Sequence, residues 1–426
     1  MEPSKKDDNT NSHEEDGLLN ESRQDCQLLL IGCFCMLAFS AGISKSIQLA
    51  IIVPESLKIH VSPTEAELIL AAFHVSSLPT LLLQPSLNKW RKEVFAAIVG
   101  LAGLVAFGVF YFAPYMKGWY LYVAVIARLV GGTSYYLICN KIIVGMARIF
   151  KGNVSNSSVA WDVAVTAGNA IGAYLGPLLV RLVGFSMTMV VCACIILKVA
   201  IVLGLAFPQQ DNTNKEAKRS IVYTHSLKLH FRPDLIAYGW GPQLGIGACM
   251  VFVEGNIIYF YMKEYKKSYG FGGVVLGASS IVYSLTSFIS GYIGKKKPAV
   301  LPGIIAVGLI SAGIQLIFMG PVFTISDTVD LGISVTSFNL LLLSSSALQY
   351  ATLTLCARKL SEQVGPEEAM SAAMNVWYMA YNIGACIGPL IAGALMKYIG
   401  FRMDFAVGTP FLLFFALLPC LTKMVS

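Results

Sequence analysis

Long apolar stretches recur along this chain, and each is close to the roughly 20 residues that a helix needs to cross a bilayer. Two examples are EVFAAIVGLAGLVAFGVFYF at 93–112 and SMTMVVCACIILKVAIVLGLAF at 186–207. Hydrophobic residues make up 56% of the chain and charged residues only 13%. Soluble domains are about a quarter charged. The sequence therefore predicts an all-α membrane protein.

The stretches predict twelve transmembrane helices in two pseudo-symmetric bundles of six. The expected spans lie near 28–53, 65–87, 94–114, 119–144, 158–181, 185–207, 235–262, 271–294, 299–322, 330–355, 367–394 and 402–422. A polar segment at 208–234 separates the two sets of six. We therefore expect a disordered cytoplasmic tail at 1–26, a first bundle at 27–207, a cytoplasmic linker at 208–234 and a second bundle at 235–426.

Basic residues predict the orientation of the helices, because Lys and Arg accumulate on the cytoplasmic side. If the N-terminus is cytoplasmic, twenty of the 31 Lys and Arg residues lie on that side and eight on the other. Three more fall within spans: Lys45, Arg128 and Lys198. The asymmetry favours both termini inside.

Two nearly identical phrases stand in equivalent places of the two halves, GAYLGPLL at 172–179 and GACIGPLI at 384–391. Small residues four positions apart let helices approach closely, and a proline bends the helix. Packing alone explains an isolated pattern, whereas its recurrence in both halves favours a deformable contact between the bundles. The residues concerned are Gly168, Gly172, Gly176, Pro177, Gly384, Gly388 and Pro389.

These phrases resemble the major facilitator superfamily. GNAIGAYLGPLL at 168–179 looks like the antiporter motif of its fifth helix, and RLVGG at 128–132 looks like its fourth-helix arginine motif. The loop LNKWRKE at 87–93 departs from the family signature, because Asn88 replaces the usual aspartate and a glycine is missing. The resemblance implies a secondary transporter of twelve helices and covers nearly the whole chain after residue 27.

Within that superfamily, IVYSLTSFISGYIGKKKP at 281–298 and MNVWYMAYNIGACIGPLIAGALMKYIGF at 374–401 resemble the vesicular amine and polyamine transporters. This branch exchanges protons for organic cations. The resemblance places Glu254 and Asp162 where the branch carries acids. For Asp162, a place near the start of its span makes helix capping the favoured role.

Charged groups inside a span are functional candidates, because burying one costs at least a few kcal/mol. Glu254, with Asn256 beside it, suits proton or substrate binding, since burial favours a neutral carboxyl. A structural salt bridge to Lys45 or Arg128 is the alternative. Arg128 either organises hydrogen bonds in its helix or biases the proton affinity of a nearby acid. Lys45 would repel a polyamine unless Glu254 neutralises it.

Aromatic residues cluster in the eleventh span at Trp377 and Tyr381, and in the fourth at Tyr136. Such rings bind organic cations or simply pack against neighbours. Trp377 and Tyr381 are four residues apart and so share one helix face, which favours a cavity wall. His74 is a lone histidine that titrates in an acidic compartment or is satisfied by packing.

The N-terminal tail contains Glu14, Leu18 and Leu19 in the spacing of an acidic dileucine sorting signal. Such a signal is read by sorting adaptors, so we expect an endosomal, lysosomal or secretory-vesicle membrane rather than the plasma membrane.

Motifs for other chemistries do not occur: the sequence has no phosphate-binding loop, no H-E-x-x-H and no CxxC pair. We expect no enzyme activity, no cofactor, no metal and no nucleic acid. The expected partners are protons, a small-molecule substrate and the lipid bilayer, and we expect a monomer. Three hypotheses remain: a proton-coupled carrier of organic amines, a symporter or exporter of organic anions or neutral solutes, and a receptor or scaffold that has lost transport.

Overall fold

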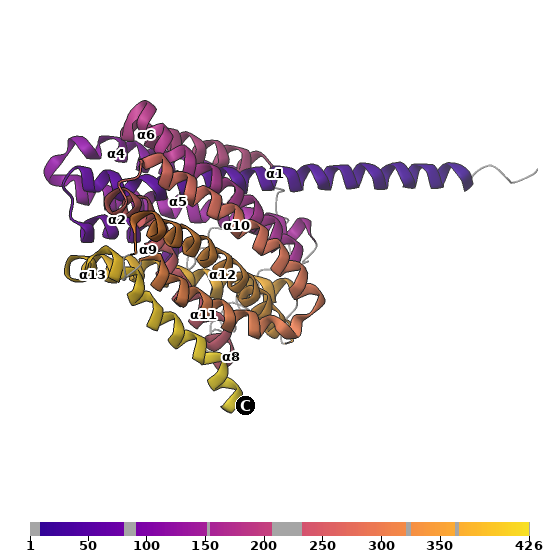
Figure 1. The fold of residues 1–426 in the computed structure, drawn as a ribbon. Helices are drawn as coiled ribbons and strands as arrows, with labels where there is room; N and C mark the ends of the chain where they lie inside the picture. Colours follow the sequence, from indigo (N-terminus) through magenta and orange to yellow (C-terminus); the bar gives the residue numbers. More distant parts are fainter. Residues whose placement is uncertain are drawn as a thin grey trace, which may run out of the picture.

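The computed structural model describes residues 9–80, 91–150, 154–206, 232–320, 325–362 and 366–425. Within these ranges every regular element is a helix (Figure 1). The main helices are α1 (Asn9–Lys58), α2 (Pro63–Val75), α4 (Lys92–Phe112), α5 (Tyr120–Ile149), α6 (Val154–Ala206), α9 (Gly241–Glu264), α10 (Tyr269–Lys296), α11 (Leu301–Met319), α12 (Asp327–Ser361) and α13 (Pro366–Val425). Short turns are η1 (Ala113–Tyr115), η2 (Lys117–Trp119), α8 (Pro233–Leu235), η3 (Ile236–Trp240) and η4 (Pro298–Val300).

The described residues contain ten segments that are long and apolar enough to cross a membrane. One of them, Val159–Leu205, is two helices, because Gly184 has φ 83° and breaks α6. The second expected span, 65–87, is described only as far as residue 80 and contains α2. These segments account for the twelve predicted spans, and the prediction of an all-α membrane protein is confirmed.

Helix α1 begins at Asn9, inside the segment for which the sequence predicted a disordered tail (Figure 1). Its apolar part, Leu28–Lys58, is the candidate span. Extending a helix that already exists costs far less than starting one, so the span gives the preceding polar residues a helical template. The backbone here therefore differs from the expectation.

Two glycines mark equivalent turns. Gly184 (φ 83°) joins the two helices of α6, and Gly400 (φ 77°) joins the two helices of α13. Both lie in the left-handed region that favours glycine because a Cβ atom is strained there. We call the end of the molecule where they lie the hinge end; α1 ends and α2 begins there too. The start of α1 and the end of α13 lie toward the opposite end, which we call the terminal end (Figure 1).

The described helices α1 to α6 (the first half) and α8 to α13 (the second half) use the same pairing. The first helix of α6 packs along α1, and the first helix of α13 packs along α9. Contacts between the halves are made by α6 with α10, by α2 with α13 and by α1 with α9.

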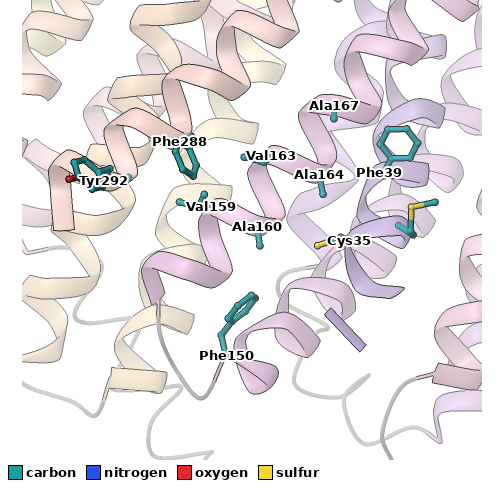
Figure 2. A pocket seen from close by; sticks show the side chains of 12 residues that line it. Cys35, Phe39, Phe150, Val159, Ala160, Val163, Ala164, Ala167, Phe288 and Tyr292 are labelled. Carbon is teal, nitrogen blue, oxygen red and sulfur yellow. The ribbon is translucent and has the colours of Figure 1, made fainter. Parts of the chain in front are cut away.

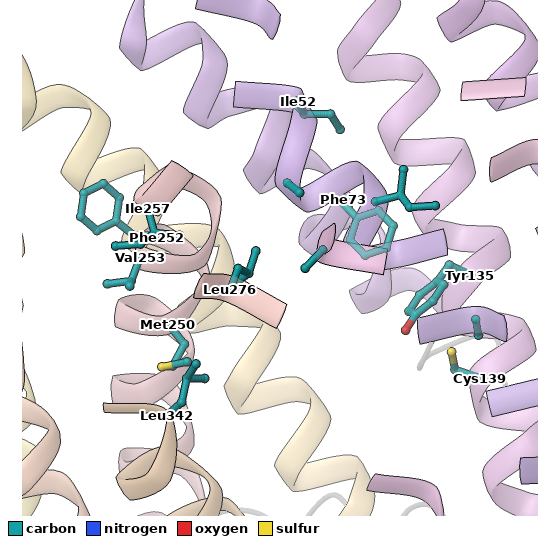
Figure 3. Close-up of a cluster of buried hydrophobic side chains, with 14 of the residues drawn as sticks. Ile52, Phe73, Tyr135, Cys139, Met250, Phe252, Val253, Ile257, Leu276 and Leu342 are labelled. Atoms are coloured by element: carbon teal, nitrogen blue, oxygen red, sulfur yellow. The ribbon is translucent and has the colours of Figure 1, made fainter. Parts of the chain in front are cut away.

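Buried apolar side chains join these helices in a core that includes Phe73 and Tyr135 of the first half and Phe252 of the second (Figure 3).

Local signals fix the helix starts that frame this core. Ser62 caps α2: its hydroxyl accepts from the Glu65 amide at 3.3 Å, while its own amide donates to the Glu65 carboxylate at 2.9 Å. This reciprocal pair is a capping box. It sets the register of α2 and thereby the inward direction of its polar residues.

Candidate functional site

A hydrogen-bonded triad crosses between the halves. The Tyr136 hydroxyl of α5 lies 2.5 Å from the Asn382 Oδ1 of α13 and 2.9 Å from the His74 Nδ1 of α2. The same His74 nitrogen lies 3.0 Å from Asn382 Oδ1. All three side chains are buried, and the Asn382 amide also donates to the Tyr378 carbonyl at 2.8 Å. His74 is therefore satisfied by partners from both halves.

Glu254 of α9 and Lys45 of α1 belong to the first long helices of the two halves, which pack against each other. Both side chains are partly buried, and their charges are close enough to interact. Within the described residues, neither group has an ion-pair partner within 4.0 Å. Because the partners come from opposite halves, Glu254 faces the interior of the protein rather than lipid. The predicted salt bridge is thus a loose electrostatic pair.

Aromatic rings of α13 border this pair. Trp377 and Tyr381 stack with their ring centres 5.7 Å apart and their planes 6° apart, as their spacing on one helix face predicts. The Tyr381 hydroxyl is within electrostatic range of Glu254. Tyr378 extends the group to Tyr136 of the other half, at 6.4 Å between ring centres. We refer to Lys45, His74, Tyr136, Glu254 and Tyr381 as the central polar cluster.

Arg128 of α5 is buried without a carboxylate partner among the described residues. Its guanidinium donates to Gln48 Oε1 of α1 at 2.6 Å and lies 4.4 Å from the ring centre of Phe73. Gln48 in turn donates to the Ser44 carbonyl at 3.0 Å. Arg128 therefore links α1, α2 and α5 within the first half, and the structure gives it no contact with Glu254.

Asp162 does not cap its helix, contrary to the expectation. Helix α6 begins at Val154, so Asp162 lies two turns inside it. Its carboxylate accepts a hydrogen bond from Ser287 of α10, whose hydroxyl is 2.6 Å from that of Ser346 of α12. Asp162 therefore forms a second polar link between the halves. The sequence misplaced the helix start because polar residues at 154–158 continue the helix beyond the apolar stretch.

The glycine stripes pack helices within each half. A Cβ atom on Gly172 would lie 2.5 Å from the Ile43 carbonyl oxygen of α1, and Gly168 and Gly176 face Phe39 and Ile47 in the same way. In the second half, Gly384 and Gly388 lie against Leu244 and Ala248 of α9. The contact between halves uses another face, where Pro177 lies opposite Gly273 of α10. Pro389 is buried. These five glycines pack helices within each half, so they do not form the predicted deformable contact between the halves.

Two acids that sequence reasoning passed over are buried near the hinge end. Glu67 of α2 is 1% exposed and Asp404 of α13 is 3% exposed. Asn256 of α9, a predicted site residue, donates to Glu67 Oε1 at 2.5 Å instead of joining Glu254. The signal was available, since both acids fall inside apolar spans. The family resemblance points to Glu254 and Asp162 instead.

A separate groove of about 710 Å³ lies between α1, α6 and α10 (Figure 2). Its lining is almost wholly apolar and includes Phe39, Val163 and Phe288. Such a surface suits acyl chains better than ions, because it offers no charged group.

The dileucine residues Glu14, Leu18 and Leu19 have side chains outside the described part of the structure. That sorting signal stays a prediction.

Comparison with known proteins fits this architecture. The family model described as the Major Facilitator Superfamily matches residues 34–365. The chain therefore belongs to the Major Facilitator Superfamily, a family of membrane transporters rather than enzymes.

Among curated proteins, the chain is similar to the MFS-type transporter SLC18B1. It is 24% identical to the Mus musculus protein over 268 residues, which is 60% of this chain and 55% of that protein. It is 23% identical to the Homo sapiens protein over 271 residues, covering 62% and 56%. The match spans a little over half the length of these relatives.

Two solved structures share the fold. A mutant of the nucleoside transporter NupG aligns with a TM-score of 0.72 at 11% identity, covering 92% of this chain and 99% of that one. A bacterial homologue of the human lysosomal transporter Spinster, in an inward-facing and occupied conformation, aligns with a TM-score of 0.68 at 13% identity, covering 93% and 97%. At these identities the likeness concerns the fold alone.

Proposed function

We propose that this protein is a proton-coupled secondary transporter that moves a small organic amine by alternating access. The observation that carries the proposal is the placement of Glu254 and Lys45 on packed helices of opposite halves, within electrostatic range of each other. A carboxylate held in the interior by a loose basic partner can exchange that partner for another cation.

The exchange follows from charge. Glu254 with Lys45 forms a neutral pair, and either a proton or an organic ammonium adds one positive charge to the same carboxylate. Because buried charges are expensive, both cations are not held there together. Binding of one therefore drives release of the other, which is the requirement for antiport.

Aromatic rings give the site a preference for organic cations. Tyr381 lies within electrostatic range of Glu254, and Trp377 stacks on Tyr381. A ring face attracts an ammonium group by about 0.5–2 kcal/mol, with the larger value in desolvated places. Metal ions that keep their water shell gain less from such a surface.

Polar links between the halves support alternating access. His74 of α2 and Tyr136 of α5 bind Asn382 of α13, and Asp162 of α6 binds Ser287 of α10. Hydrogen bonds such as these can be exchanged for others as the halves rock about the site, as in other transporters with internal repeats.

A second candidate is transport of an organic anion or neutral solute. Lys45 favours it, because a protonated Glu254 would leave the ammonium of Lys45 free to bind a carboxylate. In this case the proton and the solute travel together, and the cycle is symport.

The resemblance to vesicular amine transporters, the basic residues and the tail motif support the remaining parts of the proposal. We place both termini in the cytoplasm, the protein in an endosomal, lysosomal or secretory-vesicle membrane, and sorting adaptors on the tail. The transported amine enters an acidic compartment in exchange for protons. We propose a monomer, because one chain contains both halves of the site.

Uptake of labelled amines into proteoliposomes with an acidic interior tests the function. We expect accumulation that collapses with the pH gradient and falls at least about tenfold in Glu254→Gln, which cannot ionise. The control is Glu93→Gln, whose carboxylate is half exposed at the start of α4 and whose uptake should match the wild type.

Outcomes of this assay separate the hypotheses. Gradient-driven accumulation in Glu254→Gln contradicts the proposal. Proton-linked anion uptake that is lost in Lys45→Gln but kept in Lys198→Gln, an exposed lysine within a span, establishes the second candidate. If a folded protein transports no amine, anion or neutral solute, a receptor or scaffold role replaces both.

A further inference from the structure

The acids Glu67 and Asp404 come from opposite halves and lie near each other at the hinge end. Glu67 is on the first turns of α2, and Asp404 is just beyond the Gly400 turn of α13. Their charges are close enough to interact, and Glu67 packs against Gly393 of α13. Glu67 is therefore part of the contact between the halves, and Asp404 lies within electrostatic range of it.

Neither acid has a basic partner among the described residues, and each retains unused oxygens. Asn256 donates to Glu67 Oε1, while Glu67 Oε2 receives no hydrogen bond. Both carboxylate oxygens of Asp404 and the Oδ1 of Asn256 are also buried without a donor. A buried oxygen that lacks a donor costs about 1–3 kcal/mol, and more when it is charged. A proton on either acid supplies a missing donor and removes a buried charge.

The charged groups on the helices packed around the pair are engaged elsewhere. Glu55 pairs with Lys58 at 2.5 Å, and Arg402 pairs with Glu264 at 3.0 Å. Other titratable groups on these helices include Lys45 near Glu254, Arg128 on Gln48, Asp330 near Arg402, Lys263 over Tyr259, Tyr120 on Ser56, His74 with Tyr136 on Asn382, Glu65 on Ser62 and the Cys249 thiol on the Gly408 carbonyl. Helix α11 carries no ionisable residue.

We propose that Glu67 and Asp404 form a second proton-binding site at the hinge end, and that release of its proton loosens the contact between α2 and α13. With a proton bound, the pair carries at most one negative charge and α2 stays against α13, where the Thr64 hydroxyl donates to the Gly393 carbonyl at 2.9 Å. Without it, two buried carboxylates repel across this contact. The direction of coupling rests on the proposed function: protons from the hinge-end side close that side.

Thiol accessibility tests the site without requiring transport. In the full chain carrying Ala66→Cys, a buried position of α2 in a cluster with Ala385 of α13, reaction with a membrane-impermeant maleimide is measured at pH 5 and pH 8 and corrected for the thiolate fraction of a model thiol. The chain without Ala66→Cys gives the background of native cysteines. We expect about tenfold faster corrected labelling at pH 8, the size of a modest population shift.

The variants Glu67→Gln and Asp404→Asn, alone and combined, should label slowly at both pH values, because the amides cannot ionise. The matched control is Glu55→Gln, a carboxylate at the same end that has its own basic partner, and it should keep the pH dependence. Each variant is first checked for a single folded species by size-exclusion chromatography, and the single variants serve if the double variant does not fold.

Retention of the pH dependence in both folded single variants overturns the proposal. A second outcome also overturns it. If replacing sodium with N-methylglucamine at fixed pH changes the labelling rate, the site binds a metal ion rather than a proton. Failure of amine transport with intact pH-gated labelling rejects the proposed function alone. Proton-driven amine transport with labelling that ignores pH rejects the second proton site alone.

Discussion

Tyr136 and Asn382 are 246 residues apart in sequence, yet a 2.5 Å hydrogen bond joins them across the interface between the halves. His74 completes this link from a third helix. The connection ties the central polar cluster to the contact that must open and close during a transport cycle. Its strength therefore affects both stability and turnover.

Removing the Tyr136 hydroxyl should weaken this link. We expect Tyr136→Phe to lose about 1 kcal/mol, the net worth of a buried hydrogen bond, and to leave His74 and Asn382 short of a partner. Thermal unfolding in detergent, followed by intrinsic fluorescence, gives the midpoint. Tyr135→Phe is the control on the same helix, because Tyr135 lies near Cys139 in its own half. An equal fall of the midpoint in both variants contradicts the prediction.

Helix packing in the first half predicts a strict need for glycine at Gly172. A methyl group there meets the Ile43 carbonyl at 2.5 Å, and only a shift of backbone relieves the clash. We expect Gly172→Ala to lose about 1–3 kcal/mol. Gly108→Ala on α4 is the control, because nothing lies within 4 Å of its new methyl and alanine favours a helix by about 1 kcal/mol. A Gly172→Ala variant as stable as Gly108→Ala contradicts the packing described.

Arg128 and Gln48 should behave as a coupled pair. Gln48→Leu deprives a buried guanidinium of its acceptor, and Arg128→Met removes the charge itself. We expect the double variant to be more stable than the sum of the single losses implies, with a coupling of about 1.5–3 kcal/mol. Unfolding midpoints of the four proteins give this value. Additive losses, like those expected for Arg128→Met with the distant Gln349→Leu, would show that Arg128 acts alone.

Sequence patterns predicted the fold because the bilayer demands it. An apolar stretch of about 20 residues has few alternatives to a spanning helix. The stacking of Trp377 on Tyr381 was predictable for a similar reason, since helical spacing alone places the two rings together. Short-range geometry of this kind is written directly in the residue order.

Long-range partners were not predictable in this way. Asn256 was expected beside Glu254, but it binds Glu67, which is 189 residues away and on another helix. The rotation of α9 decides which neighbour the amide meets, and packing between helices sets that rotation. Asp162 was misassigned for a related reason, because its partner Ser287 is contributed by the other half.

The left-handed glycines at 184 and 400 let each helical hairpin reverse direction without a connecting loop. Epitope tags, fluorescent proteins or protease sites inserted at these points would therefore split a continuous helical pair. A more tolerant position on the same side of the membrane is the capped turn after Lys58, where Ile59 is 41% exposed and His60 already adopts a positive φ.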